Sequence, residues 1–351
     1  MHNQNNVLKK ISKVIVTIVT CLLFMQLTAQ DLQADNMLLF QRSNGGWSKQ
    51  FKGKSFKYDA EFSVEQRSEI AIEAAKDDAN IDNGSTTKEI RYLVQAYKKI
   101  NNPKYLTAAE KGIRFLLKAQ YKNGGWPQYY PDNHSYRGQV TFNDNAMINV
   151  MNVLQDVANK QNDLDVVDAA LVQPSAKAVS KGIECILKTQ IKVNGRLTGW
   201  CQQYDEITLK PAKARAYELP SISGFESANI VLFLMSQPNP SQEIKNAITA
   251  GVEWLQVVKI VGYNVIEVPS PATPKGKDRK VVADNTSTIW ARYYEIETNK
   301  PFFCDRDGIV KYSLDEIGYE RRNGYAWYGT WPKKLLEKDY PAWAKKNLDK
   351  Q

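Results

Sequence analysis

The sequence predicts an all-α fold, in which helices alternate between the inner and outer layers of a closed or partly closed α/α toroid. A unit made of a helix and an aromatic-rich turn recurs along the 351 residues. Helical segments with apolar residues three and four positions apart lie between its copies, and few runs alternate with a period of two. Such long-period similarity is typical of a repeated supersecondary unit. We expect minor, irregular strands, one of them near "GYNVIEVPS" (262–270).

The repeated unit predicts the outer helices. Its clearest copy is "EKGIRFLLKAQYKNGGWPQYY" (110–130), an amphipathic stretch that ends in a Gly-Gly-Trp turn. An isolated turn of the same kind, "SNGGWSK", occupies 43–49. Further copies share a Gly-Val/Ile core and lie at 180–204, 250–258 and 305–329. The outer helices should therefore contain Gly112, Gly182, Gly251 and Gly308.

The segments between these copies predict the inner helices, at 86–100, 145–160, 227–237 and 286–297. Each follows a short polar stretch: "IDNGSTT", "TFNDNAM", "GFESAN" or "VADNTST". Asp, Asn and Ser are good N-caps, and capping alone is one interpretation of these stretches. In an alternating array, however, the N-termini of all inner helices lie on one side, and the aromatic turns lead to that same side. Carboxylates and aromatic rings should thus gather at one mouth of the toroid.

The N-terminus predicts export. Lys9, Lys10 and Lys13 precede the apolar run "VIVTIVTCLLFM" (14–25), and "LTAQ" follows with small residues suited to cleavage. The run is short for a membrane span and is typical of a secretory signal peptide. We therefore expect a signal peptide at 1–30 and a single domain at 31–351. The mature chain should be a secreted or periplasmic monomer without membrane contact.

Composition excludes several chemistries. The chain has two histidines, His2 and His134, so a Ser-His-Asp triad or a multi-histidine metal site is nearly excluded. The net charge of +9 favours an acidic partner, but no dense Lys/Arg run indicates nucleic acid. Three cysteines remain after signal cleavage, which argues against a disulfide framework but leaves one bridge possible.

The residues expected at the mouth favour an acidic sugar. Carboxylates with other oxygen donors suit a hard cation such as Ca²⁺. Arginines bind carboxylate ligands through two hydrogen bonds, and Trp and Tyr present flat apolar faces to sugar rings. Such a site could hydrolyse a uronate polymer with a pair of carboxylates. It could alternatively remove the proton α to the uronate carboxylate and eliminate the glycosidic link.

Six motifs in this order resemble the family 10 polysaccharide lyases, which are pectate lyases. They span nearly the whole mature chain and read "NGGWSK", "NGGWPQYYP", "TFNDNAM", "PAKARAYELPS", "IWARYYEI" and "RRNGYAWYG". The resemblance implies an α/α toroid that cleaves polygalacturonate by Ca²⁺-assisted β-elimination, with an arginine as the base. An alkaline optimum is then expected, because free arginine has a pKa above about 12.

The resemblance also implies roles for individual residues. Arg215 matches the catalytic base, and Asp82 and Asp144 match calcium ligands. The positions expected to bind substrate are Asn83, Tyr129, Asn145, Lys213, Arg279, Arg292 and Arg306.

Three alternatives stay open. "KGIRFLLKAQYKNGGW" also resembles the QW repeat of triterpene cyclases, in which Gln and Trp tie the outer helices together. On that interpretation Gln120, Gly125 and Trp126 are structural, although no Asp-rich acid motif supports the cyclase activity itself. The chain could instead be a glycoside hydrolase of acidic oligosaccharides, or a non-catalytic carbohydrate-binding toroid that would not need Arg215.

Overall fold

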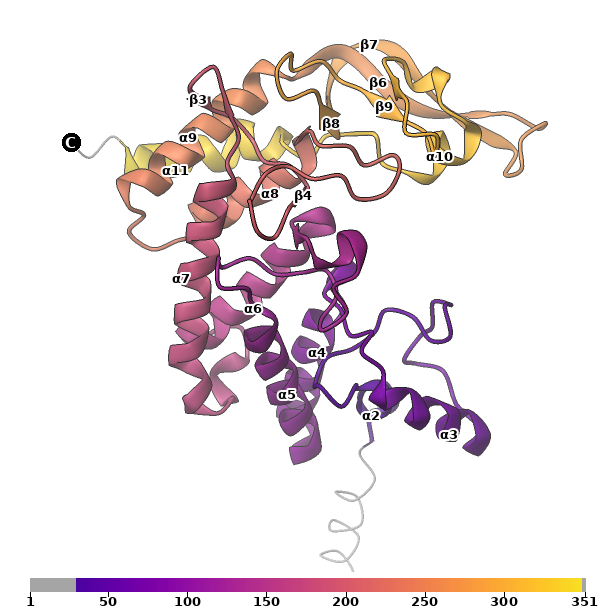
Figure 1. Cartoon of the computed structure of the whole chain (residues 1–351), viewed down its shortest axis with the longest axis vertical. Coiled ribbons are helices and arrows are strands. Elements are labelled where there is room, and N and C mark those ends of the chain that lie inside the picture. The colour runs from indigo at the N-terminus through magenta and orange to yellow at the C-terminus, as the bar shows by residue number, and fades with distance from the viewer. Residues whose placement is uncertain (1–29, 349–351) are drawn as a thin grey trace, which may run out of the picture.

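The computed structural model describes residues 30–348. The predicted signal peptide at 1–30 lies outside that range, except for its final residue, Gln30. Three helix pairs form the main body of the protein (Figure 1). They are α4 (Thr87–Ile100) with α5 (Pro103–Ala119), α6 (Ala146–Asn159) with α7 (Val172–Thr189), and α8 (Gly224–Met235) with α9 (Gln242–Val257). Helices α2 (Leu32–Phe40) and α3 (Val64–Ile72) precede them, and α10 (Tyr319–Gly324) and α11 (Tyr340–Asn347) follow.

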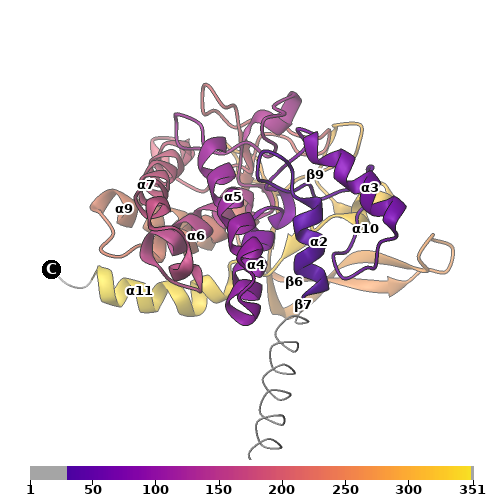
Figure 2. The same cartoon turned by 90° about the horizontal axis from the view of Figure 1, so that it is seen from below.

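The prediction of an all-α toroid is wrong, because the C-terminal third forms sheets and the fold is mixed α and β. Strands β6 (Ile260–Pro269) and β7 (Lys277–Ala291) pair as a long antiparallel ribbon, and β11 (Tyr328–Gly329) joins β7. The ribbon projects beyond the helices in both views (Figure 2). The short strands are β1 (Val140–Thr141), β2 (Lys192–Val193), β3 (Arg196–Leu197), β4 (Gln203–Tyr204), β5 (Ile222–Ser223), β8 (Tyr293–Tyr294), β9 (Phe303–Cys304) and β10 (Val310–Lys311).

Two predicted helices account for this error. The segment 286–297, expected as an inner helix, is extended, and Asp284 lies within β7 instead of before a helix. Gly308, expected in an outer helix, has a positive φ of 77° in the turn between β9 and β10. Runs rich in Val, Ile and Thr, such as 281–289, favour strands. The strand expected near 262–270 is present as most of β6.

A second repeat in the sequence explains the extended segment. "WCQQYDEITLKP" (200–211) and "WARYYEIETNKP" (290–301) share Trp, Tyr, an acidic residue, Thr, Lys and Pro at equal spacing. The two tyrosine hydroxyls accept equivalent backbone hydrogen bonds: Cys201 N donates to Tyr204 at 2.6 Å, and Ala291 N donates to Tyr294 at 2.7 Å. Each tyrosine also bridges to the proline seven residues later. The segment after Trp290 therefore repeats the loop after Trp200 and not an inner helix.

The Gln and Trp of the helical repeat are structural. Trp126 is fully buried, and its indole N–H donates to the carbonyl of Leu116 in the preceding helix at 2.7 Å. Gln120 donates to the carbonyls of Gly124 and Ala178 at 2.9 and 2.8 Å, which ties α5 to α7. The same pattern recurs around Gln41 with Trp47 and around Gln190 with Trp200. Trp126 is thus an anchor between helices and is inaccessible to a sugar.

The helix glycines make room for these tryptophans. A Cβ on Gly182 of α7 would lie 3.2 Å from the Trp126 ring and 2.7 Å from Met151. A Cβ on Gly112 would likewise lie against Trp47, and a Cβ on Gly251 would lie against Trp200. The main core therefore lies between the two helix layers, and a second, smaller cluster around Tyr293 and Trp327 lies beneath the C-terminal strands.

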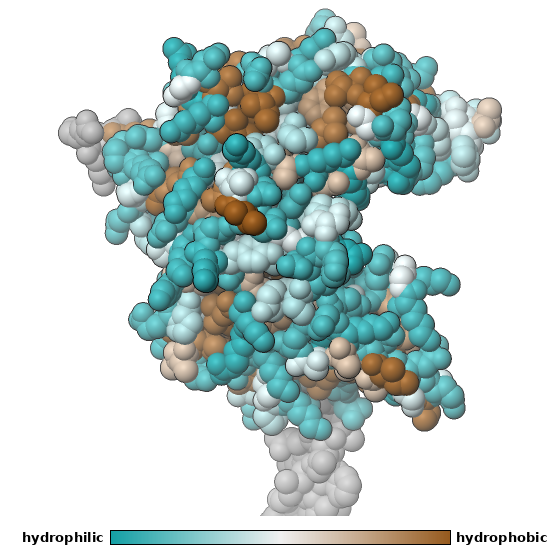
Figure 3. Space-filling model, in the orientation of Figure 1, coloured by the Kyte–Doolittle hydropathy of each residue, from teal (hydrophilic) through white to brown (hydrophobic). Residues whose placement is uncertain are grey.

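The surface is hollowed between the N-terminal helices and the C-terminal sheet, and hydrophilic residues surround the hollow (Figure 3). Cys185, Cys201 and Cys304 are buried and free. Across residues 30–348, no helix combines the length and apolar character that a bilayer crossing needs.

Candidate active site

Two short turns on the way into α4 and α6 place the carboxylates of the site. Asp82–Gly84 and Asn143–Asn145 each form one turn of 3₁₀ helix, and the two turns lie against each other. Asn83 and Asp144 both have a φ of 50°, a left-handed conformation that Asn and Asp tolerate better than other side chains. Neither turn has a side-chain cap, so capping does not account for these residues.

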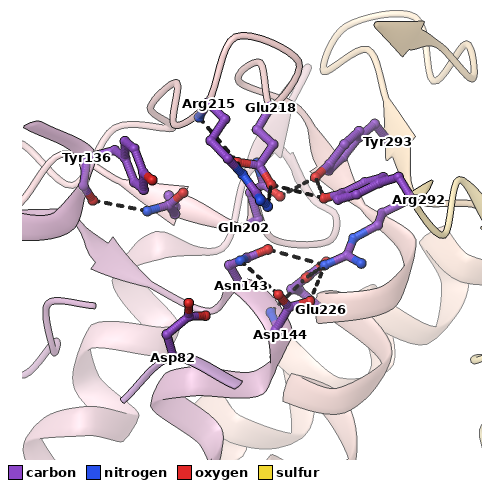
Figure 4. Close-up of polar contacts among 12 residues, drawn as sticks. Asp82, Tyr136, Asn143, Asp144, Gln202, Arg215, Glu218, Glu226, Arg292 and Tyr293 are labelled. Atoms are coloured by element: carbon purple, nitrogen blue, oxygen red, sulfur yellow. Dashed lines mark hydrogen bonds and ion pairs between the residues drawn. The ribbon is translucent and has the colours of Figure 1, made fainter. Parts of the chain in front are cut away.

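The structure brings five of the proposed residues to one polar cleft: Asp82, Asn83, Tyr129, Asp144 and Arg215. Its other lining residues are Lys49, Gln128, Tyr136, Asn143, Gln203 and Glu218. Figure 4 shows Asp82 and Asp144 on the helix side of the cleft and Arg215 on the loop that faces them. This loop runs from β4 to β5, and it therefore carries the arginine across from the turns that carry the carboxylates.

Arg292 supports Asp144 from within the protein. Its Nη2 donates to Asp144 at 2.9 Å, to Glu226 at 2.6 Å and to the amide oxygen of Asn143 at 3.2 Å (Figure 4). Arg292 is 5% exposed and Glu226 1%. Burial raises the pKa of Glu226 above its ordinary value, and the guanidinium of Arg292 opposes this rise only in part. Burial lowers the pKa of Arg292, but the surrounding acidic groups, Glu226 first among them, together outweigh burial and raise it.

Arg215 is paired with Glu218 by two parallel hydrogen bonds. Its Nε donates to Glu218 at 2.6 Å, and its Nη2 donates to the other carboxylate oxygen. The guanidinium also lies over the ring of Tyr217, 5.0 Å from its centroid. Burial lowers the pKa of Arg215, but the hydrogen bonds and the charge of Glu218 outweigh burial and raise it above the ordinary value. Arg215 is therefore a guanidinium at neutral pH.

Lys49 and Glu218 belong to the site but were missed by the sequence analysis. The ammonium of Lys49 pairs with Asp82, whose side chain is 5% exposed. Burial lowers the pKa of Lys49, but the hydrogen bond with Asp82 and the charge of that carboxylate, together with Tyr129, outweigh burial and raise it. Lys49 ends the first Gly-Gly-Trp turn. Because these turns were expected to lead to the mouth, the position of Lys49 could have predicted its place in the site. Glu218 lies three residues after Arg215 and gave no comparable signal.

The remaining proposed residues lie outside the lining of the cleft. Lys213 is exposed on the same loop as Arg215. Arg306 is exposed and pairs with Glu320 at 3.1 Å. Arg279 donates to the carbonyl of Tyr325 at 3.0 Å and lines a separate depression beside β6. Asn145 follows Asp144 in a left-handed conformation, with a φ of 63°.

The helix pairs and the cleft of carboxylates, tyrosines and one arginine place the protein among the polysaccharide lyases, and comparisons with known proteins support this class. Residues 41–336 match the family described as pectic acid lyase. A family 10 polysaccharide lyase from Cellvibrio cellulosa is 35% identical, with a TM-score of 0.75 over 91% of this chain and 93% of that chain.

An aspartate-to-alanine mutant of family 10 polysaccharide lyase from the same organism, in complex with trigalacturonic acid, gives a TM-score of 0.77. It is also 35% identical, over 92% of this chain and 94% of that chain. No curated protein sequence matches this chain. The chain belongs to the pectic acid lyase family, and its activity is that of a pectate lyase.

Proposed function

We propose that the cleft cleaves polygalacturonate by Ca²⁺-assisted β-elimination and leaves a 4,5-unsaturated sugar at the new end. The observation that carries this proposal is the placement of Arg215 across one cleft from Asp82 and Asp144. The fact that the Cellvibrio enzyme was bound to trigalacturonic acid supports the choice of substrate. We further propose that residues 31–351 act as one exported domain.

The donor set fits calcium in part. Asp82 and Asp144 offer carboxylate oxygens, and Asn83 and Asn143 offer amide oxygens, which a hard cation prefers. Within the described part of the chain, however, no group of three or more Asp, Glu, His or Cys residues is close enough to hold a metal. Calcium takes about six to eight oxygens, so water and the substrate's own carboxylates would supply the rest. A bound Ca²⁺ would neutralise the uronate carboxylate and so acidify the proton α to it.

The protein's own groups would then perform the following steps. Tyr129, which stacks on Arg137 with 4.6 Å from ring centroid to Cζ, presents a rigid aromatic edge to the sugar. Arg292 holds Asp144 in place. Arg215, as neutral guanidine, removes the α proton. The electron pair of the C–H bond forms the C4–C5 double bond, the bond from C4 to the glycosidic oxygen breaks, and that oxygen leaves with the electron pair and takes a proton from water. Since Glu218 favours the guanidinium form, the neutral fraction and the rate should rise with pH.

Hydrolysis is the weaker alternative. A glycosidase needs one carboxyl group that stays protonated beside a second that is ionised. In this cleft Asp82 pairs with Lys49 and Asp144 pairs with Arg292, so each carboxylate already has a cationic partner. Neither is placed to serve as the acid.

The test is ultraviolet absorbance of the conjugated double bond during incubation with polygalacturonate at alkaline pH, with Ca²⁺ and then with a chelator. We expect a Ca²⁺-dependent rise that Arg215→Ala abolishes. Arg114→Ala is the matched control, because Arg114 lies on α5 in an exposed ion pair with Asp168. New reducing ends without the absorbance rise would establish hydrolysis instead, and no change in either would leave a binding protein.

A further inference from the structure

A chain of hydrogen bonds behind the cleft ends on Glu218. The hydroxyl of Tyr325 donates to Glu218 at 3.1 Å and contacts the hydroxyl of Tyr293. Tyr293 in turn contacts the side-chain amide of Gln202 (Figure 4). Each hydroxyl has one proton to donate. If Tyr293 gave its proton to Gln202, the tyrosine pair would have no proton between them while Tyr325 donates to Glu218. The amide nitrogen of Gln202 would also stay buried without a partner.

One arrangement gives each of the two tyrosine hydroxyls both a donor and an acceptor. With its amide turned by half a rotation, Gln202 donates to Tyr293, Tyr293 donates to Tyr325, and Tyr325 donates to Glu218. Each hydroxyl then has an acceptor for its proton, and the protons all point toward Glu218. Such a directed chain ends on Glu218, whose carboxylate oxygen is the final acceptor.

Glu218 is also the more deeply buried member of its pair with Arg215. It is 1% exposed, whereas the side chain of Arg215 is 40% exposed. Besides the hydroxyl of Tyr325, Glu218 accepts the backbone N–H of Arg215 at 3.2 Å, its Nε–H at 2.6 Å and its Nη2–H. Of the guanidinium nitrogens, only Nη1 makes no hydrogen bond to residues 30–348.

We propose that Glu218 is the positioning residue for the catalytic arginine: it fixes two nitrogens of Arg215 against the protein and leaves Nη1 as the nitrogen that meets the substrate. The proposal rests on the proposed function of the cleft. Glu218 has two opposite effects on the reaction. It orients Arg215, which raises the rate, and it favours the guanidinium form, which lowers the fraction able to accept a proton.

These two effects can be separated by kinetics, since Glu218→Gln removes the charge but keeps the size of the side chain. The kcat per neutral arginine, obtained by extrapolating the rising pH–rate profile, should fall by about a hundredfold, the cost of a misplacement of about 1 Å, while KM changes little. The rising part of the pH–rate profile should move to lower pH, because the loss of the Glu218 charge lowers the pKa of Arg215. The other charged or titratable groups facing Arg215 are Tyr217, Tyr325, Lys49 and Arg321, and none of them changes in the variant.

The experiment measures kcat, KM and the pH–rate profile of the full chain on polygalacturonate with Ca²⁺, for wild type, Glu218→Gln and Glu184→Gln. Glu184, on the far helix α7, is the matched control and should behave like wild type. If the wild type is active and Glu218→Gln keeps the wild-type kcat, or loses kcat without any shift of the pH–rate profile, the positioning role is overturned. An inactive wild type overturns the proposed function itself, and the positioning role with it.

If Glu218→Gln fails to fold, Tyr325→Phe provides the second test. It keeps the ring beside Arg215 and removes the hydroxyl that anchors Glu218. We expect a fall in kcat of about tenfold with KM unchanged, since Glu218 loses one hydrogen bond to its charged carboxylate. A variant with wild-type kcat overturns the proposal.

Discussion

Arg292→Met should destabilise the protein strongly, and by an amount that depends on pH. The substitution keeps most of the side-chain volume but removes the cation that pairs with Glu226 and Asp144. Asp144 is 31% exposed and can be solvated, whereas the side chain of Glu226 has no exposed surface. Glu226 would become a buried, unpaired carboxylate. Removing one partner of a buried pair costs about 3–5 kcal/mol, which we expect as the fall in the free energy of unfolding near neutral pH.

The pH dependence follows from the pKa of Glu226. Burial already raises this pKa in the wild type, and the loss of Arg292 raises it further. The native variant then binds a proton more tightly than the unfolded chain, so its free energy of unfolding falls as pH rises from the ordinary range of glutamate. The loss of unfolding free energy relative to wild type should therefore be smallest near about pH 4. It should widen toward neutral pH, by about 1.4 kcal/mol for each unit by which the variant raises the pKa of Glu226 further.

The assay is urea unfolding at several pH values, followed by tryptophan fluorescence. Arg114→Met is the control for an exposed pair and should cost less than about 1 kcal/mol at every pH. Arg292→Met combined with Glu226→Gln should recover much of the loss, because no unpaired charge is left in the core. A deficit that is equal in acid and at neutral pH, or a double variant no more stable than the single one, would refute the reasoning.

Three further predictions concern the repeat and the cleft. Trp126→Phe should lower stability by about 1–3 kcal/mol through lost volume and a lost hydrogen bond while KM stays unchanged, and a raised KM in a stable variant would indicate sugar contact after all. Gly124→Ala should lower the melting temperature more than Gly195→Ala: both glycines have a positive φ, but only the first would place a Cβ 2.0 Å from the carbonyl oxygen of Lys181. Lys49→Met should strengthen Ca²⁺ binding in calorimetry by about fivefold, the equivalent of about 1 kcal/mol, and weaker binding would show that Lys49 does not compete for Asp82.

The helix pairs were accessible from the sequence because their signals are local. Apolar spacing of three and four residues marked α4 to α9, and the recurring Gln, Gly and Trp marked the joints between pairs. The ribbon of β6 and β7 was mostly missed. The apolar stretch that includes Trp290 suits a buried strand as well as a buried helix, and periodicity alone cannot separate the two. Its match to the loop after Trp200 was the signal that could have decided the question.

The sequence by itself determined the repeated helix pairs, the polar turns before α4 and α6, and the lack of histidines for a conventional triad. Only the tertiary structure decided how the charges are paired. Arg292 meets Asp144 across 148 positions of the chain, and Tyr325 meets Glu218 across 107. A side chain's spacing in the sequence reports which face of its own helix or strand it occupies. It carries no information on which distant carboxylate a long, flexible arginine will reach, because that depends on how the helix pairs and the C-terminal sheet close around the cleft.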